Sequence, residues 1–167
     1  MANSRVAGVN AVNLVWDLPA LQEAIATEPD QWRPLVFTNG CFDLLHVGHI
    51  RYLQAAKALG KTLVIGLNSD SSVQSLKGSS RPIVPQDQRA EMLAALKPVD
   101  GVVIFTETTA NNLLLGLKPD IYVKGGDYAP DTLPEMPAVR AVGASLELIQ
   151  IEIPTSTSKI IARIKEL

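Results

Sequence analysis

From residue 35 onward, short apolar runs alternate with segments of helical periodicity, and this alternation restricts the fold more than any other feature of the sequence. The apolar runs fall at residues 35–38, 62–67, 99–105, 121–123 and 146–149, and the helical patterns at 47–59, up to 77, 85–96, 110–117, 137–142 and from 156 on. Strands that are apolar along their length are typical of a parallel sheet covered by helices on both faces. Because crossovers between parallel strands are right-handed, the sequence predicts an α/β fold with a doubly wound parallel sheet of five strands.

The first 34 residues differ from this pattern and are interpreted as an extension of the main domain. Residues 18–26 are predicted to form a short amphipathic helix that Asp17 caps. Pro29 and Pro34 disfavour helical geometry in the residues before them, so residues 28–34 are predicted to be a linker. The chain is therefore divided into an N-terminal helical extension and linker, residues 1–34, and a main domain, residues 35–167.

Composition disfavours several classes of protein. Fifteen Lys and Arg against seventeen Asp and Glu give a formal net charge of −2, so no overall positive field exists to hold nucleic acid. The single cysteine, Cys41, excludes an internal disulfide and a cysteine-based zinc site. No apolar stretch reaches the ~18 residues needed to cross a bilayer, and the N-terminal residues lack the pattern of a signal peptide. We therefore expect a cytoplasmic protein without a nucleic-acid or membrane partner.

The densest group of chemistry-bearing residues lies in residues 38–49, which follow the first apolar run and lead into the next helix. Gly40 lacks a side chain where the backbone leaves the sheet, which allows a ligand to approach closely. His46 and His49, the only two histidines, are three residues apart and share a face if both are near-helical, while Gly48 clears space between them. Imidazoles beside the free amides of a helix N-terminus predict a site for an anion such as a polyphosphate.

Two other interpretations of these histidines stay open at this point. One histidine could cap the helix while the other packs against the protein. Alternatively, Asp43 could join both histidines as a zinc ligand, although this spacing without a further ligand is a weak zinc signal. Cys41 is interpreted as a compact packing residue and not as a nucleophile.

Two further segments at the carboxyl ends of predicted strands carry polar candidates. Lys77 and Arg81 flank a glycine-serine loop, residues 78–80, and are predicted to clamp phosphate groups; the alternative is a pair of solvated surface charges. Residues 124–128 follow the fourth predicted strand and read either as an ordinary turn or as a base-binding loop. In the second interpretation the glycines approach a flat ligand, while an aspartate and a tyrosine hydrogen-bond and stack the base.

The start of the last predicted helix and one arginine complete the candidates. Residues 156–158 supply hydroxyl groups and free amides, which predicts a second phosphate cradle or, in the simpler interpretation, an ordinary N-cap. Arg89 lies within a predicted helix, where it could either reach a substrate or pair with Asp87 or Glu91.

The segment Gly40-Cys-Phe-Asp-Leu-Leu-His-Val-Gly-His49 resembles the signature of the cytidylyltransferase-like nucleotidyltransferases, whose hallmark is a His-x-Gly-His element. Further segments, at residues 38–43, 68–70, 76–78 with 81–82, 123–128 and 156–157, are similar to those of the bacterial D-glycero-β-D-manno-heptose 1-phosphate adenylyltransferases. The resemblance covers residues 35–165 and implies a Rossmann-like nucleotidyltransferase fold.

The resemblance also implies a reaction. AMP would pass from ATP to the phosphate of heptose 1-phosphate, with Mg²⁺ as cofactor, giving ADP-heptose for cell-envelope polysaccharide and releasing pyrophosphate. The attacking phosphate oxygen is already anionic, so the protein must mainly position the reactants in line and neutralise charge. The resemblance further implies a homodimer, and we expect the heptose kinase that some relatives carry in the same chain to be a separate protein.

Together, the residue patterns and the resemblance assign roles to individual residues. Catalysis is assigned to His46, His49 and Lys77, nucleotide binding to Gly40, Cys41, Phe42, Gly48, Gly125, Asp127, Tyr128, Ser156, Thr157 and Ser158, and substrate binding to Asp43, Arg81 and Arg89. Asp43 is also the predicted ligand of magnesium.

The chain departs from the family pattern just before the last predicted helix. Related cytidylyltransferases carry an arginine where this chain has Gln150-Ile-Glu-Ile-Pro154, which favours the heptose group. Pro154 and Lys159 replace a glycine and an asparagine that are common there, and they leave fine substrate choice open. The alternatives are a cytidylyltransferase that uses CTP with glycerol 3-phosphate or a similar alcohol phosphate, and a non-catalytic nucleotide-binding module.

Overall fold

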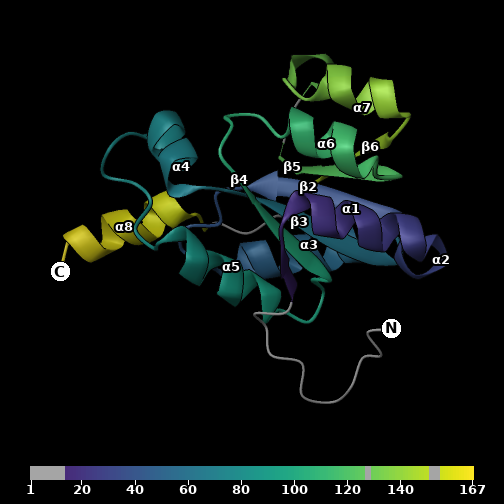
Figure 1. Ribbon diagram of the computed structural model, residues 1–167. Coiled ribbons are helices and arrows are strands. Elements are labelled where there is room, and N and C mark those ends of the chain that lie inside the picture. Colours follow the sequence, from purple (N-terminus) through teal and green to yellow (C-terminus); the bar gives the residue numbers. More distant parts are fainter. Residues whose placement is uncertain (1–13, 127–128, 151–154) are drawn as a thin grey trace.

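The computed structural model describes residues 14–126, 129–150 and 155–167, and within them six parallel strands form one sheet (Figure 1). The strands are β1 (Val15–Trp16), β2 (Leu35–Gly40), β3 (Thr62–Asn68), β4 (Gly101–Phe105), β5 (Ile121–Gly125) and β6 (Ser145–Ile149). Their order across the sheet is β1-β4-β3-β2-β5-β6, and every neighbouring pair is parallel. The predicted doubly wound α/β fold is confirmed.

The predicted number of strands is wrong by one, because residues from the extension add a strand to the sheet. β1 pairs with β4, with Val15 opposite Val102 and Trp16 opposite Val103. Two residues are too few to show the alternation by which strands are recognised in a sequence. The described part of the extension therefore belongs to the same sheet as the main domain.

The helices lie in two layers that cover the faces of the sheet. They are α1 (Leu18–Thr27), α2 (Pro29–Trp32), α3 (Val47–Lys57), α4 (Asp70–Lys77), α5 (Gln86–Ala94), α6 (Asn111–Leu117), α7 (Met136–Val142) and α8 (Thr157–Lys165), with a 3-10 turn at Pro130–Thr132. One buried cluster joins α1, α6 and α7 to Leu35 and Phe37 of β2, and a second joins α3 and α5 to Val36. α2 is a single turn within the segment that the sequence predicted to be a linker.

The strand order places a topological switch point between β2 and β5. From β2 the chain continues to β3 and β4 on one side of the sheet, and then crosses to β5 and β6 on the other side. In open α/β sheets ligands bind in the crevice outside the carboxyl ends of the strands at such a point. α4 and α8 lie beyond this edge of the sheet (Figure 1).

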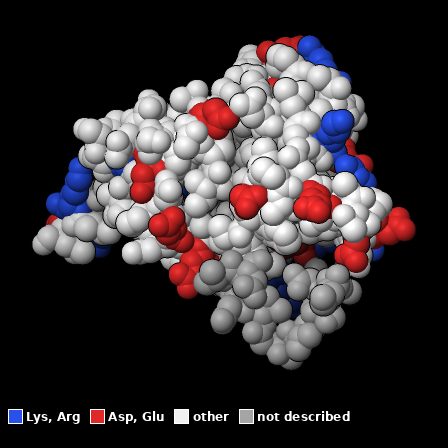
Figure 2. All heavy atoms as spheres, viewed as in Figure 1, with Lys and Arg blue, Asp and Glu red and all other residues white. Residues whose placement is uncertain are grey.

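Charged groups of both signs are visible on the face shown in Figure 2. Asp and Glu side chains are separated over this face, and Lys and Arg appear both at the opposite side of the view and at the α8 end, where Arg163 and Lys165 lie in the last turn of the helix. Among the described residues, none of the helices has the length and apolar character needed to span a membrane.

Candidate active site

The two histidines lie together where the loop after β2 enters α3. His46 is the N-cap residue of α3 and His49 lies in its first turn. Their rings are stacked, with centroids 3.9 Å apart and an angle of 25° between the planes. The Nδ1 atoms of both rings are buried and have no hydrogen-bond partner in the described part of the chain. The structure therefore brings together the pair that the sequence singled out.

Glycine and Phe42 shape this turn. A Cβ atom on Gly40 would lie 2.9 Å from Cε2 of Phe42, and one on Gly48 would lie 2.9 Å from Nδ1 of His46. Phe42 has a φ of 44° and packs its ring on His49 at a centroid distance of 5.3 Å. Gly40 was predicted to make space for a ligand and Gly48 to clear space between the two histidines. In the structure the Phe42 ring occupies the space beside Gly40, and the His46 ring occupies the space beside Gly48.

The environment of the histidines disfavours their charged forms. Burial lowers the pKa of His46, and burial together with repulsion from His46 lowers the pKa of His49 to about 4. Near neutral pH both rings are therefore neutral in the free protein, and each can donate one N–H while its other ring nitrogen accepts. A bound polyphosphate would favour the charged form again.

This lowered pKa predicts a pH dependence of stability. Between pH values of about 6.5 and 4, unfolded His49 binds a proton that the folded protein excludes, so the free energy of unfolding falls as the pH falls through this window. We expect acidification to destabilise the wild type more than a His49→Gln variant, by about 1–2 kcal/mol for this partly exposed ring. Urea denaturation of both proteins at several pH values measures the difference, and parallel pH profiles would contradict it.

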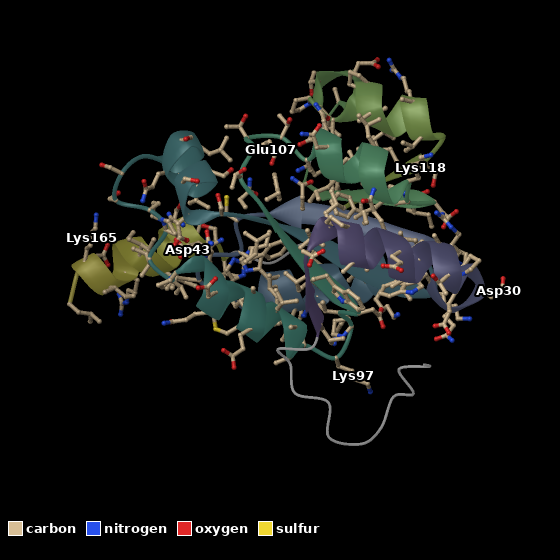
Figure 3. The ribbon with its side chains drawn as sticks, in the orientation of Figure 1. Asp30, Asp43, Lys97, Glu107, Lys118 and Lys165 are labelled. Atoms are coloured by element: carbon tan, nitrogen blue, oxygen red, sulfur yellow. The ribbon has the colours of Figure 1, made fainter. Side chains whose placement is uncertain are left out.

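Asp43 connects the loop after β2 to the segment before α5. Its buried carboxylate accepts hydrogen bonds from Nε of Arg81 at 2.6 Å, from the Ile83 amide at 2.8 Å and from the Val84 amide at 2.9 Å. Burial alone would raise the pKa of this carboxyl, but the hydrogen bonds from Val84, Ile83 and Arg81 outweigh it and lower the pKa. Figure 3 places Asp43 near α8, at the carboxyl edge of the sheet.

These contacts bear on the predicted magnesium ligand. Both carboxylate oxygens of Asp43 are engaged by protein donors, which leaves its predicted binding of magnesium or of the incoming phosphate without support. Within residues 14–126, 129–150 and 155–167, no group of three or more His, Cys, Asp or Glu side chains is arranged to hold a metal ion. The described side chains therefore do not support the zinc site considered above, whereas magnesium that binds chiefly through substrate phosphates needs only one or two carboxylates.

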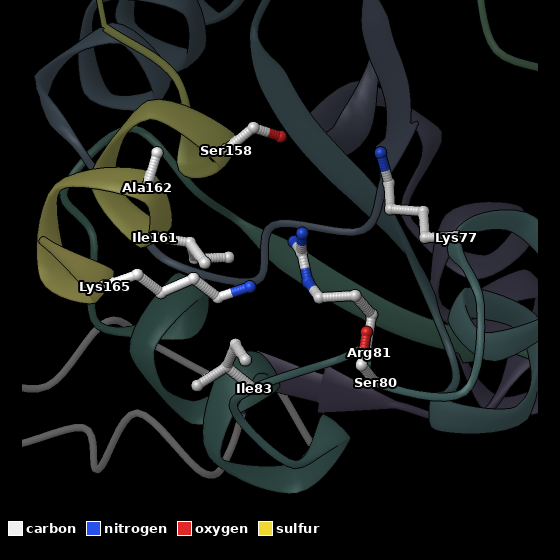
Figure 4. Close-up of a pocket in the computed structure, with 8 residues that line it drawn as sticks. All are labelled: Lys77, Ser80, Arg81, Ile83, Ser158, Ile161, Ala162 and Lys165. Atoms are coloured by element: carbon white, nitrogen blue, oxygen red, sulfur yellow. The ribbon is translucent and has the colours of Figure 1, made fainter.

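A cationic pocket lies between the loop after α4 and the helix α8 (Figure 4). Its volume is about 390 Å³, and it is lined by Lys77, Ser80, Arg81, Ile83, Ser158, Ile161, Ala162 and Lys165. Because Nε of Arg81 is held by Asp43, the end of its guanidinium extends between Ser158 and Lys165. Three cationic side chains, Lys77, Arg81 and Lys165, line this one cavity, and two of them, Lys77 and Arg81, are candidates from the sequence.

The start of α8 is held close to the histidines. The Ser156 side chain accepts a hydrogen bond from the Lys159 amide at 3.2 Å, and Thr157 Oγ1 donates to the Leu44 carbonyl at 3.1 Å. A side-chain carbon of Thr155 lies 3.8 Å from the position of a Cβ on Gly48. The amide-rich starts of α3 and α8 therefore meet, although Ser156 acts as the N-cap in the structure and Thr157 anchors the helix.

Arg89 is placed differently from the sequence prediction. Its side chain is fully buried, with Nε donating to the Val84 carbonyl, Nη1 to the Cys41 and Asn68 carbonyls, and Nη2 to the Asp70 carboxylate. All three guanidinium nitrogens are thus engaged within the protein, and the pairs with Asp87 or Glu91 are not formed. Arg89 therefore holds the Cys41 carbonyl in the loop after β2, and a direct contact with substrate finds no support.

The remaining candidates lie around the same edge. Cys41 is half-buried and free, and burial raises the pKa of its thiol, which agrees with a packing role. Gly125 ends β5, and a Cβ there would lie 3.1 Å from the Tyr52 ring. Asp127 and Tyr128 lie outside the described residues.

Lys165 belongs to the cationic pocket but was not a candidate from the sequence. It follows Ser158 by seven residues and Ala162 by three, so all three share one face of α8. That spacing could have identified Lys165 once Ser158 had been assigned to a phosphate site.

The order of the motifs, the doubly wound sheet and the stacked histidines at its carboxyl edge define a nucleotidyltransferase. The chain belongs to the cytidylyltransferase-like family, whose pattern it matches over residues 37–164, and the resemblance stated from the sequence is confirmed.

Curated relatives are similar to this chain over most of its length. The chain is 50% identical over 145 residues to a protein named bifunctional protein HldE from Syntrophotalea carbinolica, which covers 87% of this chain and 30% of the relative. It is 48% identical over 157 residues to the protein of that name from Campylobacter jejuni subsp. doylei, and this match covers 94% of this chain and 33% of the relative. The chain therefore spans about a third of the length of these relatives.

Solved structures share the fold. A lipopolysaccharide core biosynthesis protein from Thermoplasma volcanium superposes with a TM-score of 0.59 at 28% identity, covering 72% of this chain and 97% of that one. A pantoate-beta-alanine ligase from Francisella tularensis superposes with a TM-score of 0.57 at 12% identity, covering 92% of this chain and 78% of the ligase. The second likeness shows the fold alone.

Proposed function

We propose that this protein transfers AMP from ATP to D-glycero-β-D-manno-heptose 1-phosphate, giving ADP-heptose and pyrophosphate. The observation that carries the proposal is the stacked pair His46 and His49, with free buried ring nitrogens, at the point where the starts of α3 and α8 meet. The likeness to bifunctional proteins named HldE and to a lipopolysaccharide core biosynthesis protein supports the acceptor class.

The reaction matches the chemistry of this edge of the sheet. A phosphate oxygen of the sugar phosphate attacks the α-phosphorus of ATP, the bond from that phosphorus to the bridging oxygen breaks, and pyrophosphate leaves with the electron pair. The nucleophile is anionic, so no strong base is required. The neutral imidazoles donate N–H groups to charge that grows on the α-phosphate, which is the kind of stabilisation that increases in the transition state.

The cationic pocket suits the leaving group. Lys77, Arg81 and Lys165 face one cavity, and pyrophosphate is the product with the most concentrated negative charge. The residues proposed to contact the nucleotide are Gly40–Phe42, Gly125 and Ser158, with Asp127 and Tyr128 as the proposed contacts to the base. Magnesium, in this proposal, enters with the triphosphate, whose oxygens it prefers as ligands.

The proposal is tested by pyrophosphate release, with ATP and CTP each combined with heptose 1-phosphate, other sugar 1-phosphates and glycerol 3-phosphate. We expect the highest kcat/KM with ATP and the heptose 1-phosphate. Preference for CTP with glycerol 3-phosphate would replace the proposal by the cytidylyltransferase, and no turnover with any acceptor would favour a nucleotide-binding module.

Lys165 gives a prediction that depends on the cationic pocket. Replacing Lys165 by alanine removes one of the three cations that face the pocket, so we expect the KM for ATP to rise by about 3–10-fold at low ionic strength, and less at high salt. Steady-state kinetics at two salt concentrations measure the effect. The control is Lys97→Ala, which removes an equal charge from an exposed position after α5; an equal KM for both variants would contradict the role of Lys165.

A further inference from the structure

A second polar cluster lies on the opposite face of β2 from the histidine helix α3. It consists of Asn39, Asn111, Lys124 and Glu135, and we call it the Glu135 cluster. Asn39 follows Leu35 and Phe37 at alternate positions of β2, so it faces the layer that contains α6 and α7. Lys124 extends from the neighbouring strand β5 to the same place, since its Nζ donates to Asn39 Oδ1 at 3.2 Å.

Two acceptor atoms in this cluster are buried without a donor. Glu135 is only 3% exposed; its Oε1 is 3.5 Å from the Ala110 amide nitrogen, and its Oε2 has no partner among the described residues. The Oδ1 atom of Asn111, the residue after Ala110, is likewise buried and unpartnered. Burying a carboxylate or amide oxygen without a hydrogen bond is costly, so such groups call for a bound partner that donates.

The charges of Lys124 and Glu135 indicate which kind of ligand could bind at the cluster. Burial lowers the pKa of Lys124 and the Glu135 carboxylate acts against that shift, so the ammonium group that donates to Asn39 lies within electrostatic range of the carboxylate. A phosphate would meet the unpaired Glu135 oxygen unfavourably here, whereas in the pocket of Lys77, Arg81 and Lys165 the nearby Asp43 carboxylate is already paired with Arg81. Sugar hydroxyls both donate and accept, so they match two bare acceptors beside an ammonium group.

The position of the cluster relates it to the reaction. Asn39 directly precedes Gly40, where the nucleotide loop begins, and Lys124 directly precedes Gly125. The cluster therefore lies at the β2–β5 switch point, where ligands bind in such sheets. We propose that the Glu135 cluster is the subsite for the hydroxyl groups of the acceptor sugar, with Glu135 and Asn111 accepting their hydrogen bonds. This inference rests on the proposed function and assigns its acceptor specificity.

The test is a Glu135→Gln variant, which keeps the shape of the side chain and removes its charge. We expect the KM for the sugar 1-phosphate to rise about tenfold, while the KM for ATP stays within about twofold. Because one oxygen of this buried carboxylate, Oε2, has no donor and Oε1 can still accept from the Ala110 amide as the amide oxygen of glutamine, the melting temperature should not fall. The matched control is Glu147→Gln on β6, where the side chain is exposed, and its kinetics should equal those of the wild type.

The outcomes separate this subsite from the proposed function. An unchanged KM for the sugar phosphate, or an equal rise in the KM for ATP, or a lower melting temperature with both constants raised, would overturn the subsite while wild-type turnover upholds the reaction. If the wild type turns over no acceptor, the proposed function fails. Calorimetric titration with the sugar 1-phosphate then decides on the subsite: weaker binding by the variant supports it, and equal or absent binding in both proteins overturns it.

Discussion

Replacing His49 by alanine is expected to lower kcat by about 10²–10³-fold, because the imidazole is placed to donate to charge that develops on the reacting phosphate. His46→Ala should have an effect of the same order, since the two rings stack at one helix start. Both variants should change the free energy of unfolding by only about 1 kcal/mol, as the rings are partly exposed and donate no Nδ1 hydrogen bond to the described protein. Turnover at saturating ATP and acceptor, together with urea denaturation, measures both quantities.

The matched control for these variants is Gln54→Ala, which lies on the exposed side of the same helix α3. It should keep wild-type turnover and stability. A glutamine at position 49 retains an N–H donor and should recover part of the lost rate. Turnover of both alanine variants within about fivefold of the wild type would remove the histidines from the proposed mechanism.

The histidine site could be predicted from the sequence because its determinants are local. The strand β2, the loop after it and the start of α3 follow one another without interruption, so His46 and His49 lie close together. The condition that both be near-helical is not met, because His46 is the N-cap with an extended backbone, but its ring still stacks on that of His49. The five longer strands could also be predicted from local sequence, because each consists of an apolar run, and the predicted bounds lie within a few residues of the observed ones.

Contacts between distant segments could not be predicted in this way. β1 is defined only by its pairing with β4, more than eighty residues later, and its two residues carry no periodic signal. Asp43 was predicted to be a metal ligand because the sequence places a carboxylate in this turn but does not show which groups hydrogen-bond to it. The partners, Arg81, Ile83 and Val84, lie on a loop that only the packing of α5 brings to it.

The Glu135 cluster was missed for a related reason. Glu135 reads in the sequence as an exposed residue before a short helix, and nothing near it in the chain indicates burial. Its burial follows from the packing of α7 on α6, which places its carboxylate beside the Ala110 amide. Unpartnered buried atoms are properties of the folded chain and have no sequence signature.

Arg89→Met is expected to cost about 3–5 kcal/mol in the free energy of unfolding, the largest loss that we predict for a single polar residue. The guanidinium donates to the Cys41, Asn68 and Val84 carbonyls, and these acceptors would lose their donor together. The pair with Asp70 adds less, because the Asp70 side chain is 37% exposed and its charge can be hydrated in the variant. Urea denaturation measures the loss, and the m-value, the slope of the free energy of unfolding against urea concentration, should stay unchanged.

The control for this substitution is Arg140→Met, which removes an arginine whose pair with Asp131 is exposed on both sides. It should change the free energy of unfolding by less than about 0.5 kcal/mol. Since Arg89 also holds the Cys41 carbonyl in the nucleotide loop, we expect Arg89→Lys, which keeps the charge but not the fork of donors, to raise the KM for ATP more than it lowers kcat. Equal stability of the two methionine variants would contradict the structural role of Arg89, whereas an unchanged KM in Arg89→Lys would confine that role to folding.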